Sequence, residues 1–120
     1  MKKLIILSFC VFSLLACTKK KFTGTYSFWY NTEVANDLSA YGITSLSLYV
    51  DEQFVKTIDA SKHYTGDPGC GTGNFVYEES MFKKENRTHY YKIYDQTNSL
   101  IWHGPFMMSQ KECNSLQLTR

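Results

Sequence analysis

The chain has 120 residues, of which 43% are hydrophobic, 16% aromatic and 20% charged, and its formal net charge is +2. This length allows one domain and excludes folds that need a long parallel sheet with its crossover helices. The apolar content excludes a disordered chain. The near-neutral charge argues against a nucleic-acid-binding protein, which would carry a marked basic excess.

The first residues have the pattern of an export signal. Two lysines at positions 2 and 3 precede an apolar stretch over residues 4–16. This stretch is too short to span a bilayer as a helix, but it fits the apolar region of a signal peptide. It ends in Leu14-Leu15-Ala16-Cys17, which resembles the bacterial lipobox, whose cysteine is lipidated and becomes the new N-terminus. We expect residues 1–16 to be a cleaved signal helix, and an ordinary secretory signal is the alternative.

Residues 17–21 are expected to be the lipidated Cys17 and a tether to a folded domain over residues 22–120. The tether carries lysines at positions 19–21, which act either as a solvated spacer or as a contact for anionic head groups. The domain itself carries eight cations and eleven anions. Lipoproteins sent to the outer membrane usually lack Asp after the lipidated cysteine, and Thr18 fits that pattern. The resemblance therefore implies a bacterial envelope protein, anchored by its lipid in the outer membrane.

Only two cysteines, Cys70 and Cys113, fall within the expected domain. An even pair in a short exported chain is most simply a disulfide. The alternative is a metal site that combines these cysteines with histidines, of which the chain has three, at positions 63, 89 and 103. No pair has a close C-x-x-C or H-x-x-x-H spacing, so we expect no metal.

Alternation with a period of two dominates the rest of the chain and predicts strands. Residues 31–41 read as a loop with at most one helical turn, and residues 59–73 as a long glycine-containing turn. Pro105 places its strand at an edge of a sheet or at a bend. The expected strands cover residues 22–30, 43–50, 53–58, 74–79, 88–95, 100–107 and 114–119. Seven short strands predict an all-β, antiparallel sandwich of the immunoglobulin-like or transthyretin-like kind.

The second and third expected strands form a hairpin across Asp51-Glu52. With Val50 opposite Gln53, Tyr49 faces Phe54 on the outer side and Leu48 faces Val55. A type I′ turn needs positive φ at both central residues, which Glu52 resists, so we expect a longer loop.

Several strings resemble a group of small bacterial lipoproteins and surface domains, and the hairpin is similar to that of PEGA-type domains. The strings are Gly24–Trp29, Leu46–Asp51, Pro68–Gly71, Trp102–Gly104 and Cys113–Leu118. The PEGA hairpin carries glycine where this chain has Glu52. The resemblance implies a β-sandwich with a Cys70–Cys113 bridge and without catalytic residues.

No catalytic set emerges from the residues. Adjacent carboxylates such as Glu78 and Glu79 point to opposite faces of a strand, so they do not form a glycosidase-like pair. His89 is expected to point inward, His103 outward and His63 into a loop, and no G-x-S-x-G pattern is present. The glycines of residues 66–73 lack the lysine of a phosphate loop. We expect a protein that is not an enzyme and binds no cofactor.

Aromatic residues are the one lead to a binding site. The expected register places four rings on the outer side, those of Tyr49, Phe54, Tyr90 and Tyr94. Exposed aromatics can stack on sugar rings or anchor a protein partner, and the alternative is that they only stabilise cross-strand pairs or cover the second sheet.

Two functions follow. The first is a non-catalytic, lipid-anchored envelope protein that binds a protein or a glycan. The second is a small periplasmic inhibitor or immunity protein that offers carboxylates such as Glu78, Glu79 or Asp95 to a basic lytic enzyme.

Overall fold

The computed structural model describes residues 21–69, 71–82, 84–109 and 114–120. The expected signal helix, Cys17, Cys70 and Cys113 lie outside these residues. The described chain forms seven strands and one helix: β1 (Lys21–Trp29), α2 (Thr32–Ala40), β2 (Ser45–Val50), β3 (Gln53–Asp59), β4 (Phe75–Phe82), β5 (Asn86–Asp95), β6 (Leu100–Ser109) and β7 (Asn114–Gln117).

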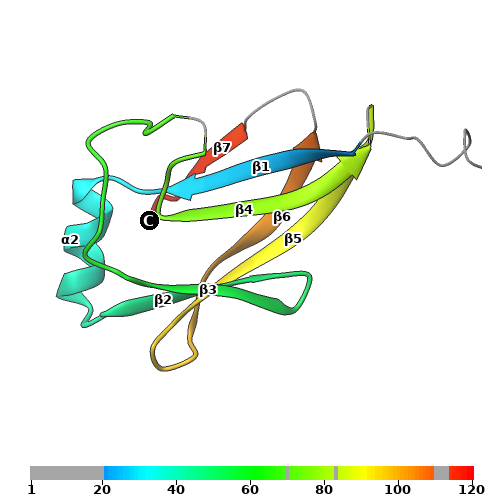
Figure 1. Cartoon of the computed structure of the whole chain (residues 1–120). Helices are drawn as coiled ribbons and strands as arrows, with labels where there is room; N and C mark the ends of the chain where they lie inside the picture. The colour runs from blue at the N-terminus through cyan, green and yellow to red at the C-terminus, as the bar shows by residue number, and fades with distance from the viewer. Residues whose placement is uncertain (1–20, 70, 83, 110–113) are drawn as a thin grey trace, which may run out of the picture.

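The strands form two sheets that face each other, in the orders β4-β1-β7 and β3-β2-β5-β6 (Figure 1). The expected all-β fold is therefore confirmed. One expectation was wrong, because the sheets are not wholly antiparallel: β7 runs parallel to β1, with Phe28 paired to Leu116. Parallel neighbours need a long connection between them, and here almost the whole chain separates the two strands.

The core lies between the sheets and is rich in aromatic rings. Phe28 of β1 packs on Tyr91 of β5 and on Phe106 of β6, with ring centroids 4.9 Å and 5.4 Å apart. Tyr30 stacks on Trp102 at 5.8 Å. Rings from both sheets thus fill the space between them, and tilted or edge-to-face contacts of this kind are favourable beyond the area they bury.

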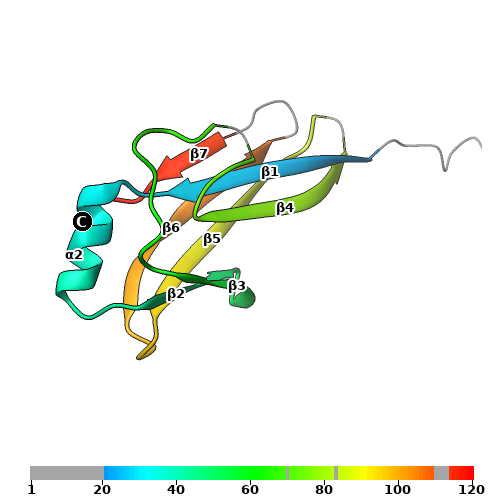
Figure 2. The ribbon, with the colours of Figure 1, turned by 60° about the vertical axis from the view of Figure 1, so that its left-hand side comes forward.

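The expectation of a loop over residues 31–41 was wrong, because residues 32–40 form α2. Asn31 caps this helix by accepting a hydrogen bond from the Val34 N–H at 3.0 Å. Val34, Ala35 and Leu38 share its buried face. The helix lies across one end of the two sheets, opposite the end at which β1 begins (Figures 1 and 2).

The hairpin of β2 and β3 also differs from the expectation. Its turn has only two residues, with φ of 48° at Asp51 and 67° at Glu52, so no longer loop is needed. Tyr49 pairs with Phe54, as expected, but Leu48 pairs with Lys56 because the register shifts between Leu48 and Tyr49. Val55 occupies the extra position in β3.

The run of charged residues over 83–87 predicts a connector between two strands, but β5 already begins at Asn86. At the other end of its hairpin, alternation with Trp102 predicts an inward Leu100, but this residue is exposed. A register shift at Tyr94 pairs this residue with Leu100, which moves Leu100 to the outer side. Pro105 lies in β6, the edge strand of the four-stranded sheet, as its missing N–H predicts.

The long connection between β3 and β4 is fixed to the end of β1. The buried side-chain amide of Asn74 accepts the Tyr30 N–H at 3.0 Å and donates to the Lys62 carbonyl at 2.7 Å. The Tyr30 hydroxyl donates to the Ala60 carbonyl at 2.8 Å. No described helix is both long enough and apolar enough to cross a membrane.

Candidate functional site

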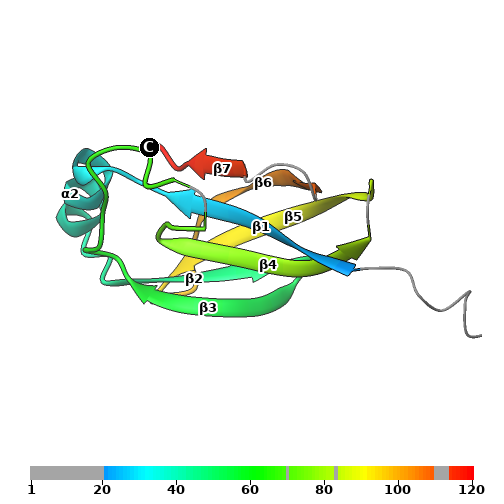
Figure 3. The ribbon, with the colours of Figure 1, turned by 45° about the horizontal axis from the view of Figure 1, so that its top comes forward.

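The outer side of the four-stranded sheet carries the four aromatic residues that the sequence singled out. Tyr49 lies on β2, Phe54 on β3, and Tyr90 and Tyr94 on β5. Their neighbours along the strands, Leu48, Val50, Tyr91 and Ile93, are buried in the core. Because side chains alternate across a strand, the four rings point away from the core. We call this surface the aromatic face. Figure 3 shows the two sheets from above, with β3 at the free edge.

Three of the four rings form a cluster. Tyr49 packs edge-on against Phe54 with centroids 5.6 Å apart, and against Tyr94 at 5.4 Å. Tyr49 and Phe54 are direct cross-strand partners, whereas Tyr94 is the diagonal neighbour of Tyr49. Phe54 remains 59% exposed. The exposed Phe54 ring therefore lies on the free edge strand β3, where a partner can contact it.

Tyr90 is on the same side but does not join this cluster. Its hydroxyl hydrogen-bonds His103 Nδ1 at 2.5 Å, and the two rings lie 6.0 Å apart. His103 is exposed on β6, as expected. Lys92 stands between Tyr90 and Tyr94 along β5, and it separates the two aromatic groups.

Charged and polar groups that the sequence analysis did not single out border the ring cluster. Lys92 Nζ donates to Glu52 Oε1 at 2.5 Å, and this hydrogen bond raises the pKa of the lysine. A depression of about 280 Å³ lies among Tyr49, Glu52, Tyr94 and Asn98. Asn98 belongs to the β5–β6 turn and has a φ of 64°. For Lys92, the alternation along β5 that places this residue between two tyrosines is the sequence signal that could have indicated its role.

His89, which lies between the sheets, contacts the turn that carries Glu52. His89 points between the sheets, as expected, with only 12% of its side chain exposed. Its Nδ1 contacts Asp51 Oδ2 and its Nε2 contacts Glu79 Oε2, both at 2.5 Å. Asp51 Oδ1 also accepts the Tyr90 N–H at 2.9 Å. The carboxylate of Asp51 thus connects the turn to β5, which fixes the position of Glu52.

The pKa values around His89 follow from these contacts. Burial lowers the pKa of His89, but the hydrogen bonds and charges of Asp51 and Glu79 outweigh burial and raise it overall. The hydrogen bond from His89 holds the pKa of Asp51 below its usual value. A neutral imidazole can donate to only one carboxylate, so the two contacts together require the imidazolium. Arg87 adds ion pairs to Glu79 and to Glu85.

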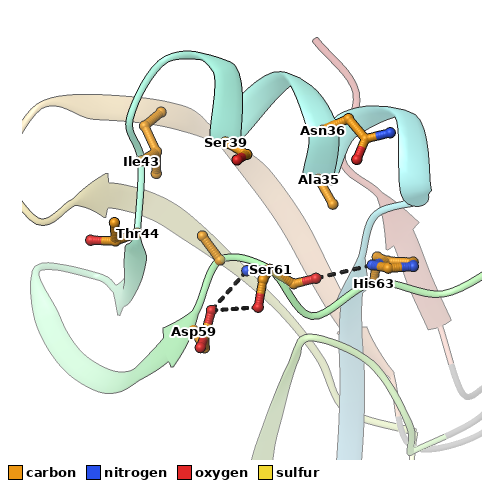
Figure 4. A pocket seen from close by; sticks show the side chains of 9 residues that line it. Ala35, Asn36, Ser39, Ile43, Thr44, Asp59, Ser61 and His63 are labelled. Carbon is orange, nitrogen blue, oxygen red and sulfur yellow. Dashed lines mark hydrogen bonds between the residues drawn. The ribbon is translucent and has the colours of Figure 1, made fainter.

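A second hollow, of about 520 Å³, lies under α2 (Figure 4). Asn36 and Ser39 of the helix line one side of it, and Asp59, Ser61 and His63 line the other. Asp59 Oδ1 accepts both the N–H and the hydroxyl of Ser61, which keeps the pKa of Asp59 low. His63 Nδ1 donates to the Ser61 carbonyl at 3.0 Å. The aspartate and the histidine therefore both bond Ser61 and not each other, and tyrosine, phenylalanine and tryptophan are absent from the lining residues.

The described residues contain no group of three or more His, Cys, Asp or Glu side chains placed to hold a metal ion. The expected disulfide partners, Cys70 and Cys113, and the expected lipidation site, Cys17, lie outside the described residues. Comparison of the chain with protein-family models, with curated proteins and with solved structures finds no match. The aromatic face is the candidate site, because it joins exposed rings to a fixed hydrogen-bonding rim.

Proposed function

We propose that this is a lipid-anchored protein of the bacterial envelope, without catalytic activity, which binds a glycan through its aromatic face. The supporting observation is the depression in which Tyr49 and Tyr94 adjoin Glu52 and Asn98. A sugar presents an apolar C–H face and a rim of hydroxyls. Aromatic rings provide the apolar contact, and a carboxylate and an amide provide the acceptors and donors that the hydroxyls need. A protein partner would use the same rings as anchors.

The proposal is tested by titrating the protein with soluble peptidoglycan fragments and envelope polysaccharides by calorimetry. We expect Tyr94→Ala to weaken binding about tenfold, a loss of about 1.4 kcal/mol. Tyr41→Ala is the matched control, because Tyr41 is a 74% exposed ring at the C-cap of α2 and is not among the residues that line the depression. If neither glycans nor a protein from an envelope extract are retained by the wild-type protein, the binding function is wrong. Retention of a protein alone, lost in Tyr94→Ala, replaces the glycan by a protein partner.

The second candidate is an inhibitor or immunity protein against a lytic enzyme. The acidic turn Asp51-Glu52 supports it, because this turn protrudes from the hairpin and is held rigidly. It is the weaker candidate, since Asp51 is paired with His89 and Glu52 with Lys92, which leaves little charge for a basic target. The two functions separate in an assay of a lysozyme-type enzyme: an inhibitor reduces its rate, and Glu52→Lys abolishes that effect.

The anchoring part of the proposal rests on the sequence Leu14-Leu15-Ala16-Cys17, with Thr18 in favour of the outer membrane. Metabolic labelling with palmitate tests it: we expect label in the wild-type chain and none in Cys17→Ser. A Cys70–Cys113 bridge belongs to the same proposal. Alkylation with and without reductant tests the bridge, and two free thiols in the native protein would refute it.

We also propose that the fold is of the transthyretin-like rather than the immunoglobulin-like kind. An immunoglobulin domain of seven strands keeps its first and second strands in one sheet. Here the first strand belongs to the three-stranded sheet and the second to the four-stranded sheet. The order β3-β2-β5-β6 and the central position of β1 support the transthyretin-like alternative. An experimental structure with β1 and β2 in the same sheet would contradict it.

A further inference from the structure

The end of the domain at which β1 begins carries a group of exposed aromatic and basic side chains. Lys21, the first residue of β1, pairs with Phe82, the last residue of β4. Its ammonium lies 5.5 Å from the centroid of the Phe82 ring. Phe82 is 39% exposed. Phe22 follows Lys21 at the start of β1 and points to the other side of the sheet, where it pairs with Met81, and it is 37% exposed. Figures 1 and 3 show the start of β1 and the end of β4 together, away from α2. We call Lys21, Phe22 and Phe82 the basal group.

The basal group is close in sequence to the proposed lipid anchor. Cys17 precedes Lys21 by four positions. Even a fully extended chain spans at most about 3.5 Å per residue, so the lipid is attached within about 14 Å of the basal group. That distance is comparable with the thickness of the head-group layer of a bilayer. An anchored domain therefore has this end at the membrane surface.

The charges at this end suit an anionic surface. Three carboxylates of the neighbouring strands and turns have cationic partners: Glu79 and Glu85 contact Arg87, and Asp51 contacts His89. Glu78 shares the exposed side of β4 with Phe82, but it lies four residues further from this end. Lys21 instead lies over a phenyl ring, and it continues a run of lysines from positions 19 and 20. Each lysine near an anionic membrane contributes about 1 kcal/mol of attraction. Aromatic rings beside such a run add apolar contact with the interfacial region.

We propose that the basal group docks on the anionic head groups of the bilayer that holds Cys17, with Phe22 and Phe82 in the interface and Lys21 at the phosphates. This inference rests on the proposed lipid anchor. Docking at this end directs α2 and the hollow beneath it away from the membrane. It also keeps the aromatic face at the side of the domain, where a partner can reach it.

Tryptophan fluorescence tests the contact, because the two natural tryptophans, Trp29 and Trp102, are only 7% and 8% exposed. The acylated full-length product is reconstituted into phosphatidylglycerol vesicles with brominated acyl chains. We expect Phe82→Trp to add emission that is blue-shifted and quenched by the bromine. The control variant Tyr41→Trp places its ring at the α2 end, and its added emission should be neither shifted nor quenched. Lys21→Glu, combined with Phe82→Trp, should reduce the quenching, as should high salt.

The outcomes separate the two proposals. If the protein floats with the vesicles but Phe82→Trp and Tyr41→Trp are quenched equally or not at all, the anchor stands and the docking is wrong. If equal quenching of Phe82→Trp persists in phosphatidylcholine vesicles and in Lys21→Glu, the role of anionic head groups is wrong. If the protein does not float, the lipid anchor is wrong and the docking inference falls with it.

Discussion

His89 is one of two residues of β5, with Arg87, that form charged contacts between the two sheets. It lies on β5 of the four-stranded sheet, yet one of its ring nitrogens contacts Glu79 of β4 in the other sheet. Tyr77 of β4 and Phe106 of β6 pack against the same imidazole, with centroids 5.7 Å and 5.5 Å away. The contacts use both nitrogens, so their strength depends on whether the ring is protonated.

This geometry predicts a pH-dependent stability. The pKa of His89 is raised in the folded state, so its contribution is fully present below the unfolded pKa of about 6.5 and is lost as the pH rises through the folded value. Each unit by which the pKa is raised corresponds to about 1.4 kcal/mol of unfolding free energy. We expect the melting temperature to fall from pH 6 to pH 9 by more in the wild type than in His89→Gln, measured by circular dichroism. Equal falls in both proteins would contradict the assignment. Glu79, Asp51, Tyr77 and Arg87 are the titratable groups around the ring.

For single residues, the sequence predicted to which side of a strand a side chain points, but it did not predict which side chains touch. Alternation along β5 correctly placed His89 inside, and the two-residue period also placed the four aromatics of the candidate site on one outer face. It could not show which rings touch, because this depends on the cross-strand register. The pairing of Tyr49 with Phe54 was predicted from the hairpin, whereas the diagonal contact with Tyr94 needs the β2–β5 pairing, which no local pattern fixes.

Among the elements, the β2–β3 hairpin has the least expected conformation. Both turn residues, Asp51 and Glu52, adopt positive φ without glycine. A left-handed conformation costs a residue with a side chain roughly 1–2 kcal/mol. The hydrogen bonds of Asp51 to His89 and to the Tyr90 N–H offset this cost. The structure therefore explains how a two-residue turn tolerates the residue that argued against it.

A pair of substitutions at Glu52 measures the backbone cost. Glu52→Ala and Glu52→Gly both remove the ion pair with Lys92, which is exposed and contributes little. Only glycine relieves the left-handed conformation. We expect Glu52→Gly to unfold at a higher urea concentration than Glu52→Ala, by about 1 kcal/mol in unfolding free energy. Equal stability of the two variants would mean that the turn carries no strain at Glu52.

The helix was missed for a physical reason. Its buried face has only Val34, Ala35 and Leu38, too few for a periodic signal over its nine residues. The cap was the better indication: Asn31 at the N-cap and Glu33 in the first turn are both typical of a helix start. The strands with a continuous buried side, β2 and β5, were predicted almost to their ends, because alternation over six or more residues is specific.

For the whole molecule, the layered all-β architecture was predictable and the neighbours of each strand were not. Alternation tells which side of a strand faces the core, but it does not tell which strand lies beside it. The four residues of β7 are too few to distinguish a parallel from an antiparallel partner. The hydrogen bond from the Leu118 N–H to the Trp29 carbonyl, at 2.7 Å, continues that parallel contact past the strand.

The side chain of Asn74 helps to connect the long β3–β4 segment to the sheet, and we expect its loss to lower the stability of the fold. Asn74→Ala leaves the Tyr30 N–H and the Lys62 carbonyl without their amide partner. We expect the unfolding free energy to fall by about 2–3 kcal/mol, since unpaired buried polar groups cost about 1–3 kcal/mol each. Chemical denaturation measures it, and Asn36→Ala, at an exposed position of α2, should change stability by less than about 0.5 kcal/mol. Similar losses in both variants would show that the amide does not hold the segment.

The parallel pairing of β1 with β7 also affects the order in which the sheets can form during synthesis. β1 is the first strand to leave a ribosome or a membrane pore, and both of its neighbours come later, β7 last of all. The three-stranded sheet therefore cannot close until β7 is available, and pairings so distant in sequence form slowly. The three-stranded sheet of a chain with this topology stays open until β7 has been made, and an open sheet is the condition a protein needs to be threaded through a narrow channel before it folds.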